Sequence, residues 1–328
     1  MPKVSIIIVN YNGSIFITKL LQSIFNQVFQ DFEVIFVDNA STDDSIQKIE
    51  HFLFNNPSFK CKFKLVKNKL NTGFSKGNLR GLELAKGDYI MFLNNDAFLA
   101  NNCLESLITL LDSDLKIGAV QPIILDAKNG NIQSAGFLMD KYCETYPNIN
   151  PHSTNYFYLS GACMIVRRSI IEKIGAFDGN LFYGDYDLSW RIRLAGYKLG
   201  VSVNSICHHY GRYATSMLFT DTKEFTQYVY ERLYVAAKNY ELKNCMLRLP
   251  LIFIFTFIRA FYNSINFRKN FFSSWFKALL LFTIYLRRCI EERVKVQMIR
   301  EVSDNVLEKS MLNHPRIIMD IKKLIMHI

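Results

Sequence analysis

The sequence predicts an α/β fold built around a mainly parallel central sheet. Short runs of β-branched and apolar residues recur through the first 125 residues, and these runs are apolar on both faces. Between most of them, apolar residues follow helical spacing, as in 17–25 and 104–111. Alternating strands and helices of this kind produce a sheet covered by helices. The predicted strands are Val4–Val9, Glu33–Val37, Phe63–Val66, Tyr89–Leu93 and Gly118–Leu125.

The segments around these strands carry weaker local signals. A helix is expected to begin at Ser41, with Asp43 and Asp44 in its first turn, where a cap and the helix dipole favour such residues. Residues 140–160 are expected to form a loop. Residues 160–213 should then add a strand at Ala162–Val166, a helix and a polar cluster.

Polar residues stand where four successive predicted strands end. In a parallel sheet the ligand lies outside the carboxyl ends of the strands. One polar strand end is ordinary turn chemistry, but four in succession predict a site for a polar ligand. The strand ends are Asn10-Tyr11-Asn12, Asp38-Asn39, Asn68 to Asn71, and Asn94-Asn95-Asp96.

Charge divides the 328-residue chain into two parts. Residues 1–237 hold 23 Lys and Arg against 22 Asp and Glu, whereas residues 238–328 hold 16 against 7, which places +9 of the net +10 in the last quarter. Half of the residues are apolar, which excludes a disordered chain. Seven scattered cysteines indicate a reducing compartment. The first apolar run lacks a cleavage site and is interpreted as a strand, so we expect a cytoplasmic protein.

A set of motifs resembles those of the family-2 glycosyltransferases, in particular the rhamnosyltransferase-like branch, over about residues 3–213. The resemblance implies the A-type glycosyltransferase fold, a nucleotide diphosphate sugar donor, and inversion at the anomeric carbon. The motifs are VSIIIVNYNG (4–13), VDNASTD (37–43), NTGFSKGNLRG (71–81), LNNDA (93–97), GACMIVRR (161–168), GAFD (175–178), GDYDLSWRIRLAGYKL (184–199) and CHHYG (207–211).

The resemblance assigns Asp38 to recognition of the nucleobase, with Tyr11 stacking beside it. Glycines at 73, 77 and 81 permit close backbone approach, and a helix beginning there would direct its N-terminus at an anion. Tight helix–sheet packing is the alternative. The segment matches neither a P-loop nor a dinucleotide fingerprint. The residues expected at the nucleotide sugar are Asn10, Tyr11, Asp38, Asn71, Gly73, Gly77, Asn78, Asn94, Asn95, Asp96 and Arg191.

Asn94-Asn95-Asp96 occupies the place of the Asp-x-Asp motif of this family. A diphosphate needs countercharge, which Mg²⁺ or Mn²⁺ supplies. Asn94 replaces the first carboxylate, so Asp96 is the expected carboxylate ligand. The resemblance places a second metal ligand at His209, with His208 as the alternative.

Inverting transfer needs a base that accepts the proton of the attacking hydroxyl. Relatives carry Glu-Asp where this chain has Gly184-Asp185, and the resemblance makes Asp185 the base. Asp187 is the alternative base, or else a cap or supporting group. Arg191 either meets the diphosphate or packs in the core with a surface ion pair. Because Asn94 and Gly184 replace carboxylates, a catalytically silent nucleotide-sugar-binding subunit is the opposing hypothesis.

The C-terminal segment is basic and aromatic. No acidic residue occurs from Leu242 to Ile290, and Arg248 and Arg259, eleven residues apart, return to nearly the same helix face. A cationic face opposite an apolar face predicts a helix lying on anionic lipid. Core packing, an oligomer contact and membrane insertion are alternatives, whereas nucleic-acid binding is not expected, because the aromatics alternate with Leu and Ile. We therefore expect a catalytic domain over 1–215 and a helical, membrane-associating segment over 216–328. The enzyme would be peripheral on the cytoplasmic face, using a glycan or lipid-linked glycan acceptor.

Overall fold

The computed structural model describes residues 1–211 and 221–312. Its strands are β1 Val4–Asn10, β2 Phe32–Asp38, β3 Phe63–Lys67, β4 Tyr89–Asn94, β5 Ala97–Leu99, β6 Ile117–Asp126, β7 Ile132–Ser134, β8 Phe137–Met139, β9 Thr145–Pro147, β10 Cys163–Arg167 and β11 Lys198–His209. Its helices are α1 Ser14–Phe25, α2 Ser45–Asn55, α3 Pro57–Lys60, α4 Gly73–Leu82, α5 Cys103–Ser113, α6 Arg168–Ile174, α7 Asp185–Leu194, α8 Thr222–Asn239, α9 Leu242–Phe267, α10 Phe271–Ile284, α11 Leu286–Met298 and α12 Asp304–Leu307. A 3₁₀ turn follows at Glu308–Ser310.

The central sheet confirms the predicted α/β fold and has the order β3-β2-β1-β4-β10-β6-β11-β5, with β7 paired to β6. Strands β3, β2, β1 and β4 are parallel to one another, and so are β6 and β11. Strand β10 is antiparallel to both β4 and β6, and β5 and β7 are also antiparallel to their neighbours. The sheet is therefore mixed, with the four parallel strands β3, β2, β1 and β4 at one edge.

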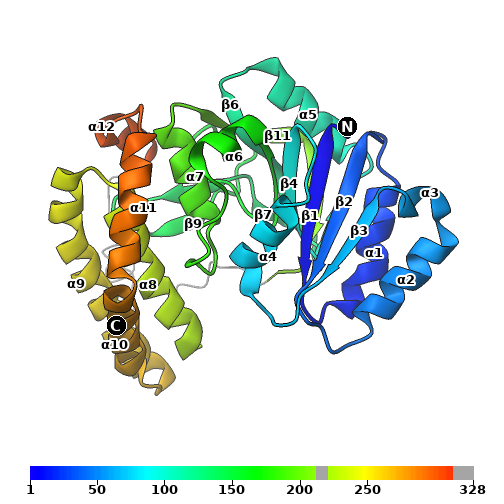
Figure 1. The fold of residues 1–328 in the computed structure, drawn as a ribbon. Coiled ribbons are helices and arrows are strands. Elements are labelled where there is room, and N and C mark those ends of the chain that lie inside the picture. The colour runs from blue at the N-terminus through cyan, green and yellow to red at the C-terminus, as the bar shows by residue number, and fades with distance from the viewer. Residues whose placement is uncertain (212–220, 313–328) are drawn as a thin grey trace.

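Alternating side chains of the strands supply two apolar layers. In β1, Ile6 and Ile8 join the core beneath α1, α2 and α5, while Ile7 joins the core beneath α4, α6 and α7. Both faces are fully buried, as the continuous apolar strand sequences predicted. The carboxyl ends of β1 and β2 reach the lower edge of the sheet in Figure 1, where α4 also begins.

Helix α2 begins at Ser45, four residues later than the sequence predicted. The backbone N–H of Ser41 donates to the Asp38 carboxylate (3.0 Å), which holds this residue in the turn after β2. The Asp43 carboxylate accepts from the N–H groups of Ser14 (2.9 Å) and Ser45 (3.1 Å). Local side-chain hydrogen bonds therefore compete with the first helical turn. The expected loop 140–160 also contains β9, which pairs with β8.

The C-terminal helices gather at one side of the molecule, with α7 between them and the sheet (Figure 1). They share a buried apolar cluster with α7: the indole of Trp190 packs edge-on against the ring of Tyr240, with centroids 4.7 Å apart. The predicted boundary at 215/216 lies outside the described residues. Within the described part, α9 is the one helix long and apolar enough to cross a membrane by length and composition, and one third of its most apolar window is buried.

Candidate active site

Four strand ends meet at one edge of the sheet, as the sequence predicted. At the ends of β1, β2 and β4, the Asn10 amide donates to the Asp38 carboxylate (3.2 Å) and accepts from the Asn95 amide (2.7 Å). Beyond β3, the Asn68 amide donates to the Asn39 side-chain oxygen (2.8 Å). These links are mostly between neutral amides, so the edge is polar without many fixed charges.

The two residues predicted to bind the nucleobase, Asp38 and Tyr11, differ in how far their side chains are exposed. The Asp38 side chain is buried, and its two oxygens accept hydrogen bonds from the Asn10 amide and the Ser41 N–H. Tyr11 is 50% exposed at the end of β1. Tyr11 thus offers a free aromatic face, whereas Asp38 first of all orders the strand ends.

Helix α4 presents an open N-terminus and a tightly packed middle. Gly73 has φ +78° and open space where a Cβ would lie, and its N–H donates to the Asn71 side chain (2.9 Å). A Cβ at Gly77 would lie 2.6 Å from a Val9 methyl group in β1. Gly77 therefore serves helix–sheet packing, the alternative stated for these glycines. Asn78 is buried and donates to the carbonyl of the preceding turn at Phe74 (3.0 Å).

The predicted metal ligands lie together: Asp96 is in the turn between β4 and β5, and His209 is the last residue of β11. The Asp96 Oδ1 atom lies 3.2 Å from His209 Nε2, and the Asn94 amide nitrogen lies 3.3 Å from the same atom. On the other side of the ring, His209 Nδ1 lies 2.7 Å from Gln133 Oε1. The Gln133 amide nitrogen is directed at the Gly211 carbonyl (3.3 Å), which fixes the side-chain oxygen toward the histidine.

This arrangement fits a divalent cation. Because Gln133 Oε1 can only accept, Nδ1 carries the proton, and in the neutral ring the lone pair on Nε2 faces the Asp96 carboxylate. Two electron-rich atoms at 3.2 Å repel each other unless a proton or a cation lies between them. Within the described residues no cluster of three or more His, Cys, Asp or Glu side chains forms a metal site. Further ligands would therefore come from the diphosphate.

Asp185 begins α7 beside this edge. Its carboxylate accepts from the N–H groups of Gly161 (3.0 Å) and Tyr186 (2.9 Å). The carbonyl of Ala162, the residue after Gly161, accepts from the Asn94 N–H (2.9 Å). Gly161 and Ala162 therefore connect Asp185 with the end of β4. Burial raises the pKa of Asp185 to about 6, although those backbone hydrogen bonds oppose the rise. No ion pair within the described residues holds this carboxylate, which suits a proton acceptor.

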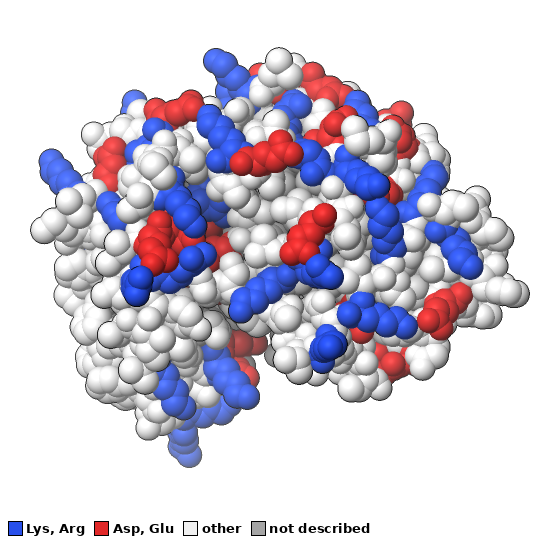
Figure 2. Space-filling model, in the orientation of Figure 1, with Lys and Arg blue, Asp and Glu red and all other residues white. Residues whose placement is uncertain are grey.

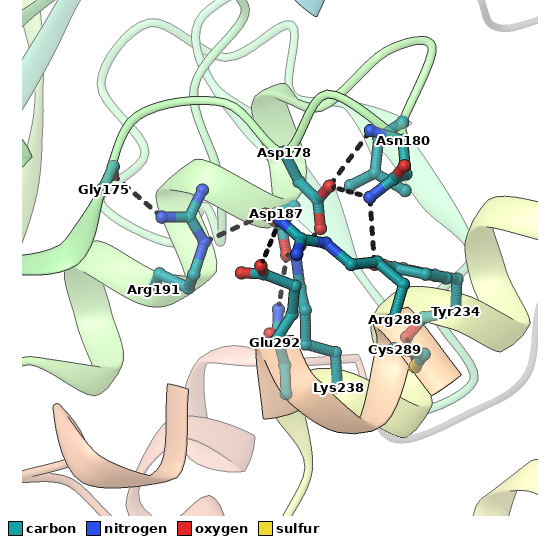
Figure 3. A network of polar contacts seen from close by, with 12 residues as sticks. Gly175, Asp178, Asn180, Asp187, Arg191, Tyr234, Lys238, Arg288, Cys289 and Glu292 are labelled. Atoms are coloured by element: carbon teal, nitrogen blue, oxygen red, sulfur yellow. Dashed lines mark hydrogen bonds and ion pairs between the residues drawn. The ribbon is translucent and has the colours of Figure 1, made fainter. Parts of the chain in front are cut away.

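Asp187, two residues later, is fully buried in a network of charges (Figure 3). Its carboxylate pairs with Lys238 Nζ (2.9 Å) and Arg191 Nε (2.9 Å) and accepts from the Asn239 amide (3.1 Å). Lys238 also pairs with Asp178 (2.8 Å). Burial favours the neutral acid at Asp178, but the Lys238 ammonium outweighs it and holds the pKa near 2.

The prediction that Arg191 contacts the diphosphate is wrong. Its guanidinium donates to Asp187 and to the carbonyls of Ile174, Gly175 and Ala176, and the side chain is buried. The alternative, core packing with an ion pair, describes what the structure contains, except that the pair is buried and not at the surface. Asp187, buried and paired with Lys238 and Arg191, has the contacts of a supporting group.

Two residues near the site have no signal in the motifs. Gln133 in β7 orients His209, and Glu231 in α8 accepts from the N–H groups of Phe182 and Tyr183, just before Asp185. Glu231 is buried, and burial raises its pKa to about 8. Neither residue ends a predicted strand. A glutamate within a stretch of α8 that is mostly apolar and aromatic, apart from the adjacent Arg232, is a sequence hint of a buried acid.

Comparison with known proteins identifies the family of this chain. The model of the glycosyl transferase family 2 matches residues 5–175, more than half of the chain, and the protein belongs to that family. An uncharacterized glycosyltransferase of Haemophilus influenzae is 36% identical over 34% of this chain and 43% of its own length. The GalNAc(5)-diNAcBac-PP-undecaprenol beta-1,3-glucosyltransferase of Campylobacter jejuni is 32% identical over 33% of this chain and 34% of its own.

Solved structures share the fold over nearly the whole chain. The mannosyltransferase PcManGT of Pyrobaculum calidifontis, in complex with GDP-Man and Mn²⁺, has a TM-score of 0.57 at 17% identity, covering 91% of this chain and 86% of that one. TarS 1–349 of S. aureus, in complex with UDP-GlcNAc, has a TM-score of 0.57 at 19% identity, covering 91% and 90%. The A-type glycosyltransferase fold is thereby confirmed. The chain spans less than half the length of the two curated relatives described above.

Proposed function

We propose that the protein is an inverting glycosyltransferase that moves a sugar from a nucleotide diphosphate donor to a hydroxyl of a glycan acceptor. The observation that carries the proposal is the meeting of three features at one edge of the sheet. These are the polar strand ends, the Asp96–His209 pair and the Asp185 carboxylate. Family membership supports the same reaction class.

In the proposed reaction, Asp185 accepts the proton of the acceptor hydroxyl as that oxygen attacks the anomeric carbon. The new glycosidic bond forms on the face opposite the breaking bond to the diphosphate, and the nucleoside diphosphate leaves with the electron pair. A pKa near 6 keeps Asp185 ionised at neutral pH while leaving it basic enough to accept a proton. The open N-terminus of α4, at Gly73, faces the same edge and would favour the anionic leaving group.

Asp96 and His209 are the proposed protein ligands of Mg²⁺ or Mn²⁺, with Asn94 beside them. The bound ion would neutralise the charge that develops on the diphosphate oxygens. The PcManGT structure contains Mn²⁺ with its donor, which supports a divalent metal without choosing between the two ions. Gln133 would keep the metal-binding nitrogen of His209 free of a proton.

We further propose a lipid-linked glycan as acceptor, at the cytoplasmic face of a membrane. The name of the Campylobacter relative specifies an undecaprenol-linked acceptor for that protein. The motifs that resemble the rhamnosyltransferase-like branch suggest a deoxyhexose or hexose as the transferred sugar, and dTDP-sugars therefore belong among the donors to be tried.

A donor screen tests the proposal. UDP-, GDP- and dTDP-sugars are incubated with the protein, Mg²⁺ or Mn²⁺ and a membrane extract that supplies acceptors, and the released nucleoside diphosphate is measured. Release that depends on one donor and on the metal is expected. Tight donor binding without any release, across all donors and extracts, would instead identify a catalytically silent nucleotide-sugar-binding subunit.

A further inference from the structure

Helix α9 buries four polar side chains and exposes many of its large apolar ones. Arg248 and Arg259 are 7% and 5% exposed, and Thr256 and Asn263 are buried with them. The periodicity that predicted a shared face for the two arginines is therefore correct, but that face lies against the protein. This contradicts the expected cationic surface. The exposed apolar residues of α9 are Leu242, Met246, Leu247, Phe253, Ile254, Phe257, Phe261 and Ile265.

Specific polar contacts fix this orientation. Arg248 pairs with Glu308, and Arg259 pairs with Glu144 (3.2 Å). Acidic residues from outside α9 therefore neutralise both arginines. The indole N–H of Trp275 in α10 donates to the Thr256 hydroxyl (3.1 Å). Rotating α9 to hide its phenylalanines would break these contacts and expose buried charges.

Helix α10 extends the same apolar surface. Phe276, Leu280 and Ile284 are each more than 60% exposed and stand four residues apart, on one helix face. Rings join the two helices, since Trp275 packs against Phe253 with centroids 4.6 Å apart. Figure 2 shows the lower left of the molecule, over α9 and α10, as a broad white area with Lys and Arg at its lower edge. We call the exposed apolar residues of α9 and α10 the α9–α10 face.

The two helices that form this face carry exposed basic residues, and their own sequences contain no acidic residue. Arg268 and Lys269, in the turn between the helices, and Lys277 in α10 are exposed. No Asp or Glu occurs between Leu242 and Ile290. Two copies meeting through this face would bring these like charges together, whereas anionic lipid headgroups would complement them.

We propose that the α9–α10 face inserts into the headgroup and upper acyl region of a lipid bilayer. Phe253, Phe257 and Phe261 enter the apolar layer, and Arg268 and Lys269 meet lipid phosphates. The helix lies along the bilayer and does not cross it, because Arg248 and Arg259 stay on the protein side. This surface extends the proposed function, and vesicle binding is measured without any donor or acceptor, so either proposal can fail alone.

The test compares three double variants of the full chain by sedimentation with phosphatidylcholine vesicles and with vesicles containing phosphatidylglycerol. Phe257→Ser/Phe261→Ser should weaken binding to anionic vesicles about tenfold or more at both low and high salt, because apolar burial is lost. Arg268→Ser/Lys269→Ser should weaken it only several-fold, and only at low salt, because salt screens the charges. Ile15→Ser/Phe54→Ser, which removes even more exposed apolar residues from α1 and α2, should change nothing.

Quenching of tryptophan emission by brominated acyl chains gives a readout that requires no substitution. Trp275 is one of two tryptophans in the chain, and its ring also packs against Phe257 (5.2 Å) and Phe276 (5.2 Å) of the α9–α10 face. Quenching on vesicles is expected. Absence of quenching, or unchanged binding of the phenylalanine variant, would overturn the proposal. So would a concentration-dependent dimer in ultracentrifugation that the same variant abolishes, since a second copy would then be the occupant.

Discussion

Among the described residues, charged side chains form fewer ion pairs at the strand-end site than next to the C-terminal helices. At the strand ends, amides hold one another in place, and Asp185 has no ion-pair partner within the described residues. Between α7 and α8, Asp178, Asp187, Lys238 and Arg191 neutralise one another out of contact with water. A charge without an internal partner can serve a ligand, whereas a paired, buried charge holds elements together. This difference separates the two aspartates at the start of α7.

The largest expected effect comes from breaking the buried network. Lys238→Met leaves Asp178 and Asp187 without the ammonium they share, and removing one partner of a buried ion pair costs about 3–5 kcal/mol. Urea unfolding measures the loss. Lys295→Met is the matched control, because Lys295 is exposed and, among the described residues, pairs only with Glu292, so a change under about 1 kcal/mol is expected. Equal effects of the two substitutions would contradict the role given to the network.

The second prediction separates Asp185 from Asp187. Asp185→Asn should lower kcat on the order of a hundredfold while donor affinity stays nearly constant, because the base is lost. Asp187→Asn should mainly lower the free energy of unfolding, because Lys238 and Arg191 lose a charge partner. In the wild type, kcat/KM should rise with pH up to about 6 and then level, as Asp185 loses its proton. Wild-type turnover in Asp185→Asn would show that another group is the base.

The sequence predicted the parallel half of the sheet and the meeting of the strand ends because both depend on local periodicity. It could not predict which face of α9 packs inward. Arg248 and Arg259 are recognisable as one helix face, but their partners Glu308 and Glu144 are 60 and 115 residues away. The prediction for Arg191 failed for a related reason: Asp187 is only four residues away, but the fold also brings the carbonyls of the turn at 174–176 against the guanidinium. Tertiary pairing decided each case.

A third, smaller effect tests whether the amide of Gln133 orients the metal ligand. Asp96→Ala should abolish metal-dependent donor binding, whereas Gln133→Leu should weaken Mn²⁺ binding about 10–100-fold, because His209 loses the acceptor that fixes its tautomer. Calorimetric titration of Mn²⁺ into the protein with a nucleoside diphosphate measures both. Gln47→Leu, at an exposed position of α2, is the control. Wild-type affinity in Gln133→Leu would leave Gln133 without a part in the site.

The last prediction concerns Glu231, which lies between the two regions. Burial raises its pKa from 4.5 to about 8, so the folded protein keeps a proton on Glu231 that the unfolded chain releases above pH 4.5. The stability contributed by this protonation is complete below pH 4.5 and is lost as pH rises through about 8. Glu231→Gln keeps a neutral acceptor for the N–H groups of Phe182 and Tyr183 and has no proton to lose. Relative to wild type, the variant should therefore gain about 1 kcal/mol in unfolding free energy for each pH unit between pH 5 and pH 8. Urea unfolding across that range measures the difference. If the difference in unfolding free energy between variant and wild type does not change with pH, Glu231 is ionised in the folded protein. The turn before Asp185 would then be held by the Glu231 carboxylate.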